Sequence, residues 1–447
     1  MFRGYTNKAI LYFLRLSCLI LLVCNVEPLK AEIVSSERVS SSKKLQTTKK
    51  DTSEKPIMQR HKKESLWRFA PLPSVAYNIE RGFGYGAYIT LFKKKEVPKG
   101  VRGSRYEYSI NLGLFQTTKG YQNHKLVFDA PYLSRSRLRF QSILGYESQN
   151  TSWYSGVGTP AALQQPLVDN KAYLHPLRSL WFMPSLTQPL VWINKALTLS
   201  FGWIGRYAYV SLPTNSLITR EKPIGSEGGL LSSVQLSLAW DSRDREPDTQ
   251  GGIWTEVSMR TAQKFLRSDW SYVAANLTHR HYLKLSQSPW VIFAYRLGLD
   301  WQNGQVPFFQ RGMMGGVQWT ELGGNSVLRG YKFGRFRGET SAYLSTEFRA
   351  RVLRFFFKNR PVDMQLCPLL DLGSIQGAND VEFVQPQLKK SQWLWGTIGI
   401  GGRTVYDEGF VVRVDITWAL ERYQKVSNDG VQHRAQLGIF AMTGHSF

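Results

Sequence analysis

The chain has 447 residues, of which 43% are hydrophobic and 13% aromatic, enough for one large domain or two ordinary ones. Its formal net charge of +24 and its negative mean hydropathy exclude a helical membrane protein built from several apolar segments. Only one stretch of the sequence stays apolar over many residues.

That stretch, "AILYFLRLSCLILLVC", spans residues 9–24 and follows a basic start. Its most apolar part is too short for a helix that spans a bilayer, and the small residue Ala31 lies a few positions further on. This pattern predicts a secretory signal peptide over residues 1–31, cleaved after Ala31.

The cysteines leave one alternative for this segment, a lipoprotein signal that ends at Cys24. Against it, Val23 is larger than the small residue that such signals carry before the cysteine. Removal of the signal peptide takes Cys18 and Cys24 away and leaves Cys367 alone. We therefore expect no intramolecular disulfide.

Residues 32–69 are rich in Ser, Lys and Glu and show no apolar periodicity. Such a composition buries too little surface to offset the loss of chain entropy, so this segment is predicted to be a disordered, basic periplasmic tail. Its lysines either bind anionic lipid headgroups or belong to a solvated tether without a partner.

Residues 70–447 form the predicted folded part, in which segments alternate apolar and polar side chains. In "GFVVRVDITWALE", residues 409–421, Trp418 and Leu420 share an apolar face, while Asp415 and Glu421 lie on the other face. Similar alternation predicts about sixteen strands, near residues 73–80, 83–93, 105–117, 122–130, 135–147, 172–186, 196–209, 231–241, 252–262, 270–283, 289–302, 340–353, 362–373, 392–403, 409–420 and 431–443.

Two architectures produce such a pattern, a large soluble β-sandwich or β-solenoid and a transmembrane β-barrel. Many segments have the length of a tilted strand that crosses a bilayer, with aromatic residues at their ends and a polar second face. With the signal peptide, these features predict an all-β fold, an antiparallel barrel in the outer membrane. If both termini are periplasmic, turns after even-numbered strands are periplasmic and the segment between the eleventh and twelfth strands is a long extracellular loop.

Three motifs resemble the BamA and TamA superfamily, the surface-antigen barrels that assemble or translocate proteins at outer membranes. "SVLRGYKFGRFRGE", residues 326–339, resembles the family's Arg-Gly-aromatic loop, and "LLDLGSI", residues 369–375, resembles its Asp-x-Gly strand. "AWDSRDREPDTQGGIW", residues 239–254, resembles its periplasmic turn, with the motif residues Asp241, Arg243, Asp244, Pro247 and Gly251. The resemblance covers Pro71–Phe447.

The resemblance implies a loop that folds back into the lumen, with Arg329 held by Glu347 and Asp371, Gly330 at a turn and Tyr331 packed on the wall. Alternation independently places Glu347 and Asp371 on the inward face. A buried guanidinium needs such carboxylates to offset its desolvation. The alternative is a solvated surface loop with incidental charges. Two further arginines, Arg335 and Arg337, are expected to matter less.

The family carries periplasmic POTRA domains, for which the 32–69 segment has no room. The resemblance therefore implies a member that lacks them, which puts the delivery of client proteins in doubt. The leading functional hypothesis is a monomeric barrel for assembly, insertion or translocation. It would act through its lumenal loop and a weak seam between the first strand and the terminal strand, which precedes Phe447. The alternative is a structural barrel or surface antigen without insertase activity.

Other classes of function find little support in the sequence. It contains no catalytic elbow, metalloprotease motif or phosphate loop, so neither an enzyme nor a cofactor is expected. His279 and His281 lie on one strand face but lack a third metal ligand in reach. For a secreted barrel the excess of basic residues favours outer-membrane lipid and lipopolysaccharide as partners, alongside client proteins, over nucleic acid.

Overall fold

The computed structural model describes residues 67–443 except 79, 95–105, 132, 134–137, 159–162, 245–247, 288–289, 317–318, 358, 378–393, 407–409 and 425–430. The predicted signal peptide, nearly all of the predicted tail, Pro247 and Phe447 lie outside the described residues.

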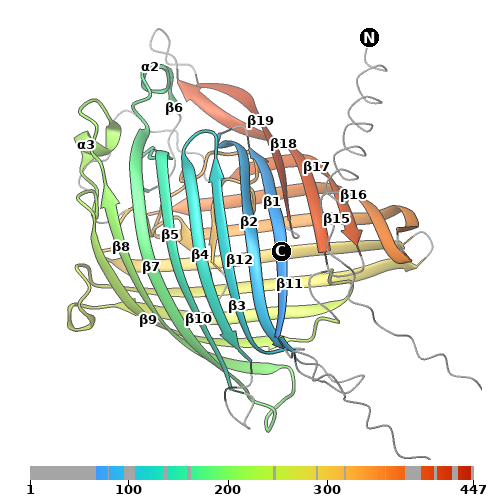
Figure 1. Ribbon diagram of the computed structural model, residues 1–447. Coiled ribbons are helices and arrows are strands. Elements are labelled where there is room, and N and C mark those ends of the chain that lie inside the picture. The colour runs from blue at the N-terminus through green and yellow to red at the C-terminus, as the bar shows by residue number, and fades with distance from the viewer. Residues whose placement is uncertain are drawn as a thin grey trace, which may run out of the picture.

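Sixteen long antiparallel strands close into a barrel (Figure 1). They are β1 Trp67–Asn78, β2 Gly82–Lys94, β3 Tyr106–Thr117, β4 Tyr121–Ala130, β5 Arg139–Trp153, β7 Leu174–Pro189, β8 Leu197–Val210, β9 Gly229–Asp241, β10 Gly252–Ala262, β11 Tyr272–Gln287, β12 Trp290–Gly304, β15 Thr340–Phe357, β16 Arg360–Gln376, β17 Trp395–Tyr406, β18 Phe410–Gln424 and β19 Val431–Thr443. Each pairs with the next along the chain. The barrel and all sixteen predicted strands are thus confirmed.

Smaller elements lie in the connections. They are β6 Leu163–Gln164, α2 Gln165–Asp169, α3 Leu217–Glu221, the 3-10 helix η1 Lys264–Leu266, and a hairpin of β13 Met313–Met314 with β14 Thr320–Glu321. None of the helices among the described residues is long and apolar enough to cross a membrane.

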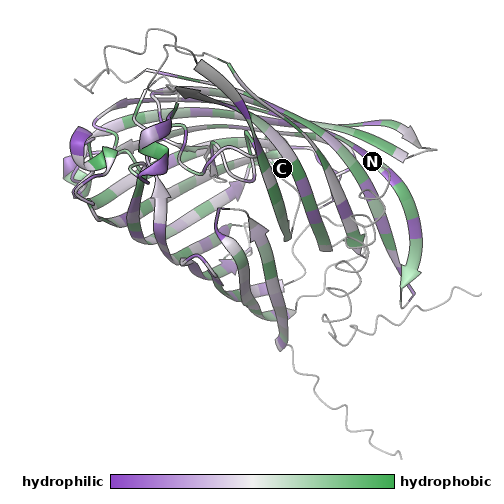
Figure 2. Cartoon of the chain, turned by 90° about the horizontal axis from the view of Figure 1, so that it is seen from above, coloured by the Kyte–Doolittle hydropathy of each residue, from purple (hydrophilic) through white to green (hydrophobic). Residues whose placement is uncertain are grey.

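The two faces of the strands differ as the alternation predicts, and Figure 2 shows hydrophobic and hydrophilic bands alternating along them. On β18, Trp418 and Leu420 are exposed, whereas Asp415 and Glu421 are completely buried. In a transmembrane barrel the exposed apolar face contacts lipid and the polar face lines the interior. The charged side chains of these strands therefore point inward.

The first strand begins earlier than the sequence pattern indicates, at Trp67 rather than near residue 73. Pro71 and Pro73 interrupt the pattern, because proline cannot donate a ladder hydrogen bond. Both prolines lie in the part of β1 that pairs with β2 and has no register partner among the described residues of β19. Proline is tolerated in such an edge position.

The barrel closes through a short seam between β1 and β19 (Figure 1). Its described register contains two residue pairs, Tyr77 with Ala441 and Asn78 with Phe440. By contrast, β1 pairs with β2 along all 12 of its residues. Within the described residues, backbone pairing at the seam is therefore much shorter than at the neighbouring strand junction.

The lengths of the connections between strands indicate which end of the barrel is extracellular. Residues 154–173, 211–228 and 305–339 form long connections at one end, while residues 190–196 and 242–251 form short ones at the other. Outer-membrane barrels have long extracellular loops and short periplasmic turns. This arrangement fits the orientation predicted from strand parity.

Cysteine labelling tests this orientation at two exposed lysines, Lys264 in the β10–β11 connection and Lys195 in the β7–β8 turn. A membrane-impermeant maleimide should label Lys264→Cys on intact cells and Lys195→Cys only after the outer membrane is breached. The buried native Cys367 should add no background. The opposite labelling pattern would reverse the orientation.

Candidate functional site

The centre of the candidate site is Arg329, in the connection between β12 and β15. The backbone bends sharply there, with a φ of 50° at Leu328 and 101° at Gly330. A Cβ atom at residue 330 would also lie 2.8 Å from the Thr417 hydroxyl oxygen on β18. Glycine therefore serves two purposes at this position, the turn and the close approach of the loop to the wall.

Arg329 is completely buried and makes a dense set of hydrogen bonds. Its Nε and Nη2 donate to the two carboxylate oxygens of Asp371 on β16, at 2.8 and 2.7 Å, and its Nη1 donates to Glu347 Oε1 on β15 at 2.7 Å. The Arg329 backbone N–H also donates to Asp371, at 3.0 Å. The loop is thus bound to two inward-facing carboxylates through a bidentate fork, a geometry that lysine cannot reproduce.

The charge cluster around Arg329 is larger than the sequence indicated. Asp415 on β18 lies 3.6 Å from Arg329 Nη1 and accepts a hydrogen bond from Arg403 on β17. Glu347 also accepts from Arg403 Nη2, at 2.9 Å, and from Arg349 Nε, at 3.0 Å. Among the described residues we define the charge cluster as Arg329, Arg349, Arg403, Arg413, Glu347, Asp371 and Asp415.

The protonation state of Arg329 follows from this surrounding. Burial alone opposes the charged form, but Asp371, Glu347 and Asp415 outweigh it and raise the pKa of Arg329 well above its ordinary value. The guanidinium therefore stays charged, and its hydrogen bonds are charge-assisted.

Tyr331 joins the loop to two further strands. Its hydroxyl donates toward the backbone oxygens of Gly396 on β17 and Leu420 on β18, at 3.0 and 2.9 Å. Its ring packs edge-on against Phe336 and Trp395. The loop thus contacts four consecutive strands, β15 to β18, within three residues of its sequence.

Arg335 forms a second buried ion pair of the loop, at a position that was expected to matter less than Arg329. Its Nε and Nη2 donate to the Glu421 carboxylate on β18 at 2.9 and 3.0 Å, and both side chains are buried. Arg337 is buried too, with Tyr154 and Phe308 rings within 6 Å of its guanidinium carbon. Sequence position did not reveal these contacts, because it does not show which inward carboxylate a loop arginine reaches.

The turn between β9 and β10 holds the second motif. Arg243 donates from Nε and Nη2 to both carboxylate oxygens of Asp241, at 3.0 and 2.8 Å. Asp244 accepts from the Gln250 backbone N–H at 3.0 Å, which closes the turn. A Cβ atom at Gly251 would meet nothing within 4 Å, whereas Gly252 has a φ of 102° and lies against the Ser242 carbonyl. The glycine that the turn geometry requires is therefore Gly252.

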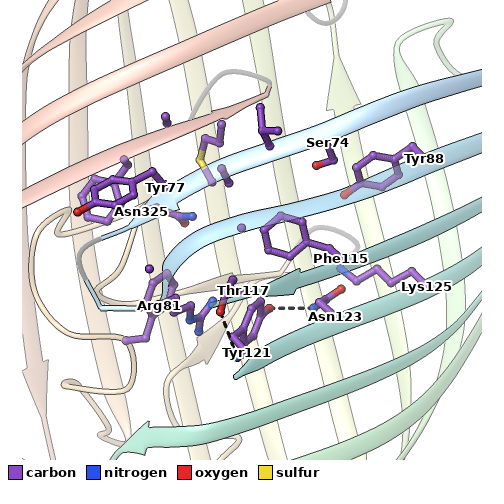
Figure 3. A pocket seen from close by; sticks show the side chains of 18 residues that line it. Ser74, Tyr77, Arg81, Tyr88, Phe115, Thr117, Tyr121, Asn123, Lys125 and Asn325 are labelled. Atoms are coloured by element: carbon purple, nitrogen blue, oxygen red, sulfur yellow. Dashed lines mark hydrogen bonds between the residues drawn. The ribbon is translucent and has the colours of Figure 1, made fainter. Parts of the chain in front are cut away.

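A cavity of about 290 Å³ lies beside the seam, bordered by β1 to β4, β19 and the loop residues Asn325 and Phe333 (Figure 3). Arg81 lies between the rings of Tyr121 and Phe333, with its guanidinium carbon 3.9 and 3.7 Å from their centres. Lys332 forms an ion pair with Glu80 at 3.2 Å. The same loop therefore contacts both the charge cluster and the β1–β2 turn next to the seam.

His279 and His281 have polar partners on neighbouring strands. His279 Nδ1 lies 2.8 Å from the Thr255 hydroxyl, and His281 Nδ1 lies 3.1 Å from the Tyr295 hydroxyl. Within the described ranges, no three His, Cys, Asp or Glu side chains are grouped to hold a metal ion.

Comparisons with known proteins point to one family. A family model described as the Omp85 superfamily domain matches residues 102–439, and no curated protein matches the sequence. Among solved structures, BamA from Haemophilus ducreyi lacking POTRA domains 1-3 is 14% identical with a TM-score of 0.56, over 85% of this chain and 70% of that one. CdiB from Escherichia coli is 13% identical with a TM-score of 0.49, over 83% of this chain and 62% of that one. CdiB from Acinetobacter baumannii is 13% identical with a TM-score of 0.46, over 85% of this chain and 60% of that one.

Proposed function

The chain belongs to the Omp85 superfamily of bacterial outer-membrane barrels, and from this premise we propose that it assembles, inserts or translocates outer-membrane or surface proteins. The proposed route is the seam between β1 and β19, where a client strand would pair with the exposed edge of β1. Clients would be β-barrel or surface proteins, and lipid and lipopolysaccharide would surround a monomeric barrel. We propose no catalytic activity.

The observation that carries this proposal is the length of the seam. Among the described residues, most of β1 pairs with β2 alone and has no register partner on β19. An unpaired strand edge is a template for another strand, and proteins normally cover such edges. Among the described residues only two pairs join β1 to β19. Opening the seam at these pairs therefore breaks few backbone hydrogen bonds.

The loop contacts support a role for residues 305–339 beyond surface exposure. We propose that the charge cluster and the Arg335–Glu421 pair keep this loop inside the lumen, where it braces β15 to β18 while the seam opens. A loop held there also argues against a passive pore. We also propose that residues 1–31 are a signal peptide and that the segment between it and β1 is a periplasmic tail.

A disulfide across the seam tests the function. In cells depleted of the native protein, oxidised Tyr77→Cys/Ala441→Cys should fail to restore the outer-membrane protein content, and reduction should recover it. The control Val257→Cys/Leu277→Cys joins an outward-facing pair of β10 and β11, which have an ordinary long register. It should restore the content in both redox states.

If the oxidised Tyr77→Cys/Ala441→Cys barrel restores the outer-membrane protein content as well as its reduced form does, the proposed route through the seam is wrong. A depleted cell with an unchanged census of outer-membrane proteins would instead favour a structural barrel or surface antigen.

A further inference from the structure

Two arginines that do not belong to the charge cluster oppose each other on the inner wall. Arg280 on β11 and Arg296 on β12 are direct register partners, and both are more than nine-tenths buried. Like charges directly opposite on neighbouring strands repel each other, and this repulsion is stronger where water is excluded. The fold therefore holds two positive charges together at an energetic cost.

Neither guanidinium has a carboxylate partner. No ion pair among the described residues includes Arg280 or Arg296, and the Nε of each is buried without a hydrogen-bond partner. The same row of the wall holds a carboxylate on each side, and both already have an arginine partner. Asp241 lies beyond Trp254 and accepts from Arg243, and Asp371 lies beyond Ser345 and accepts from Arg329 at both of its oxygens. The Nε of each arginine is therefore an unused donor, and the two positive charges lie side by side without a carboxylate between them.

Aromatic rings hold the two arginines in place without neutralising them. The Arg280 guanidinium carbon lies 4.6 Å from the Trp254 ring centre, and that of Arg296 lies 5.1 Å from the Tyr343 ring centre. Gly298 makes room for Tyr343, because a Cβ atom there would collide with its ring. Cation–π contacts orient a guanidinium but leave its N–H donors free at the edge.

A third donor continues the row. Ser345 on β15 is the register partner of Arg296, and its hydroxyl is completely buried without a hydrogen-bond partner. Arg280, Arg296 and Ser345 thus lie side by side on three consecutive strands, all from the inward face. Such a row of positive and hydroxyl donors is suited to an anion with several acceptor oxygens.

We propose that Arg280, Arg296 and Ser345 form a binding site for a phosphoryl group on the inner wall of the barrel. A phosphate monoester carries a charge between about −1.5 and −2 at neutral pH and offers three acceptor oxygens, which matches two guanidinium groups and one hydroxyl. A carboxylate, with one charge, would leave the pair half neutralised. The phosphoryl group comes either from free phosphate or from a lipid headgroup.

The site borders the β9–β10 turn, because Trp254 lies between Arg280 and Arg243 of that turn. By the predicted orientation this is the periplasmic end of the barrel. The site does not depend on the seam or on the proposed function, since its residues lie on β11, β12 and β15.

Thermal unfolding in a phosphate-free maltoside detergent tests the site, with inorganic phosphate as the probe and sodium chloride at equal ionic strength as the reference. Phosphate should raise the unfolding midpoint of the wild-type barrel, because a ligand that binds only the folded state stabilises it. Arg296→Gln should abolish this rise. Without phosphate, the same variant should unfold at the wild-type temperature or above, because the repulsion is removed.

Two further variants separate an anion site from a structural role. Arg206→Gln removes another buried inward arginine, one that donates to Ser179 and lies on β8; it should keep the phosphate response. Arg280→Lys keeps the charge but loses the planar fork, and should weaken the apparent phosphate affinity by about tenfold.

Lipid arms identify the source of the group. If a lipid headgroup is the natural ligand, phosphatidic acid added to the micelles should raise the wild-type unfolding midpoint relative to diacylglycerol with the same chains. If free phosphate is the natural ligand, only inorganic phosphate should raise it. If neither probe shifts the wild-type midpoint, or if Arg296→Gln keeps the full response, the site is wrong.

Discussion

Arg329→Ala is expected to lower the free energy of unfolding of the barrel by about 3 to 5 kcal/mol, the usual cost of removing one member of a buried charge set. The substitution removes both side-chain donors that Asp371 uses and one of the donors to Glu347. Asp371 then keeps only a backbone N–H, and that bond depends on the loop staying in place.

Urea unfolding of the barrel in lipid vesicles, followed by the faster gel migration of the folded form, measures this change. Arg329→Lys should recover only part of the loss, because an ammonium group cannot bridge two carboxylates through a planar fork. Arg354→Ala is the matched control, since it breaks an arginine–aspartate pair on the β15–β16 hairpin whose arginine is 42% exposed. Its cost should stay within about 1 kcal/mol. Equal costs for Arg329→Ala and Arg354→Ala would contradict a lumenal anchor.

The strands were predictable because a barrel wall has one lipid face and one inner face, and period-two alternation records this directly. The ion pairs between inward-facing side chains were not predictable in this way. Glu347 and Asp371 followed from alternation together with the family motif, but alternation gives only the face of a residue. Asp415 was placed on the correct face of its strand and still was not joined to Arg329.

Register explains the difference. Which inward residues become neighbours depends on how four strands are offset, and this offset is invisible in any one segment. Arg403 and Asp415 meet because β17 and β18 form a hairpin with Gly401 opposite Asp415. The sequence did contain a partial signal for the charge cluster. Each of three predicted strands carries an inward carboxylate, and the chain has an excess of basic residues that could pair with them. Those carboxylates were more informative than the loop arginines themselves.

The loop of residues 305–339 shows a second limit of sequence-based prediction. "KFGRFRGE" has no periodicity that assigns its arginines to partners, and Arg335 and Arg337 were expected to matter less than Arg329 because they lie nearer the end of the loop. Both are buried, and Arg335 makes a bidentate pair with Glu421. The sequence indicates that a basic loop meets an inner wall with carboxylates, whereas the path of the loop backbone decides which arginine reaches which acid.

Glu347→Gln should destabilise the barrel at least as much as Arg329→Ala, by about 3 to 5 kcal/mol, because Glu347 accepts from three arginines, Arg329, Arg349 and Arg403. The two substitutions change the formal charge of the cluster in opposite directions. Four guanidinium groups and three carboxylates give it a charge of +1. Arg329→Ala makes it neutral, and Glu347→Gln makes it +2.

This opposition separates two explanations of the cluster. If net charge governs stability, Arg329→Ala should be mild and Glu347→Gln severe. If specific pairing governs it, both should be severe, and the double variant should cost less than the sum, with a coupling energy of about 1 to 3 kcal/mol. We expect the second result, because every carboxylate in the cluster is held at hydrogen-bond distance by a named donor. Additive effects in the same vesicle unfolding assay would mean that Arg329 and Glu347 act independently, and the loop would then lack the anchor on which its proposed role depends.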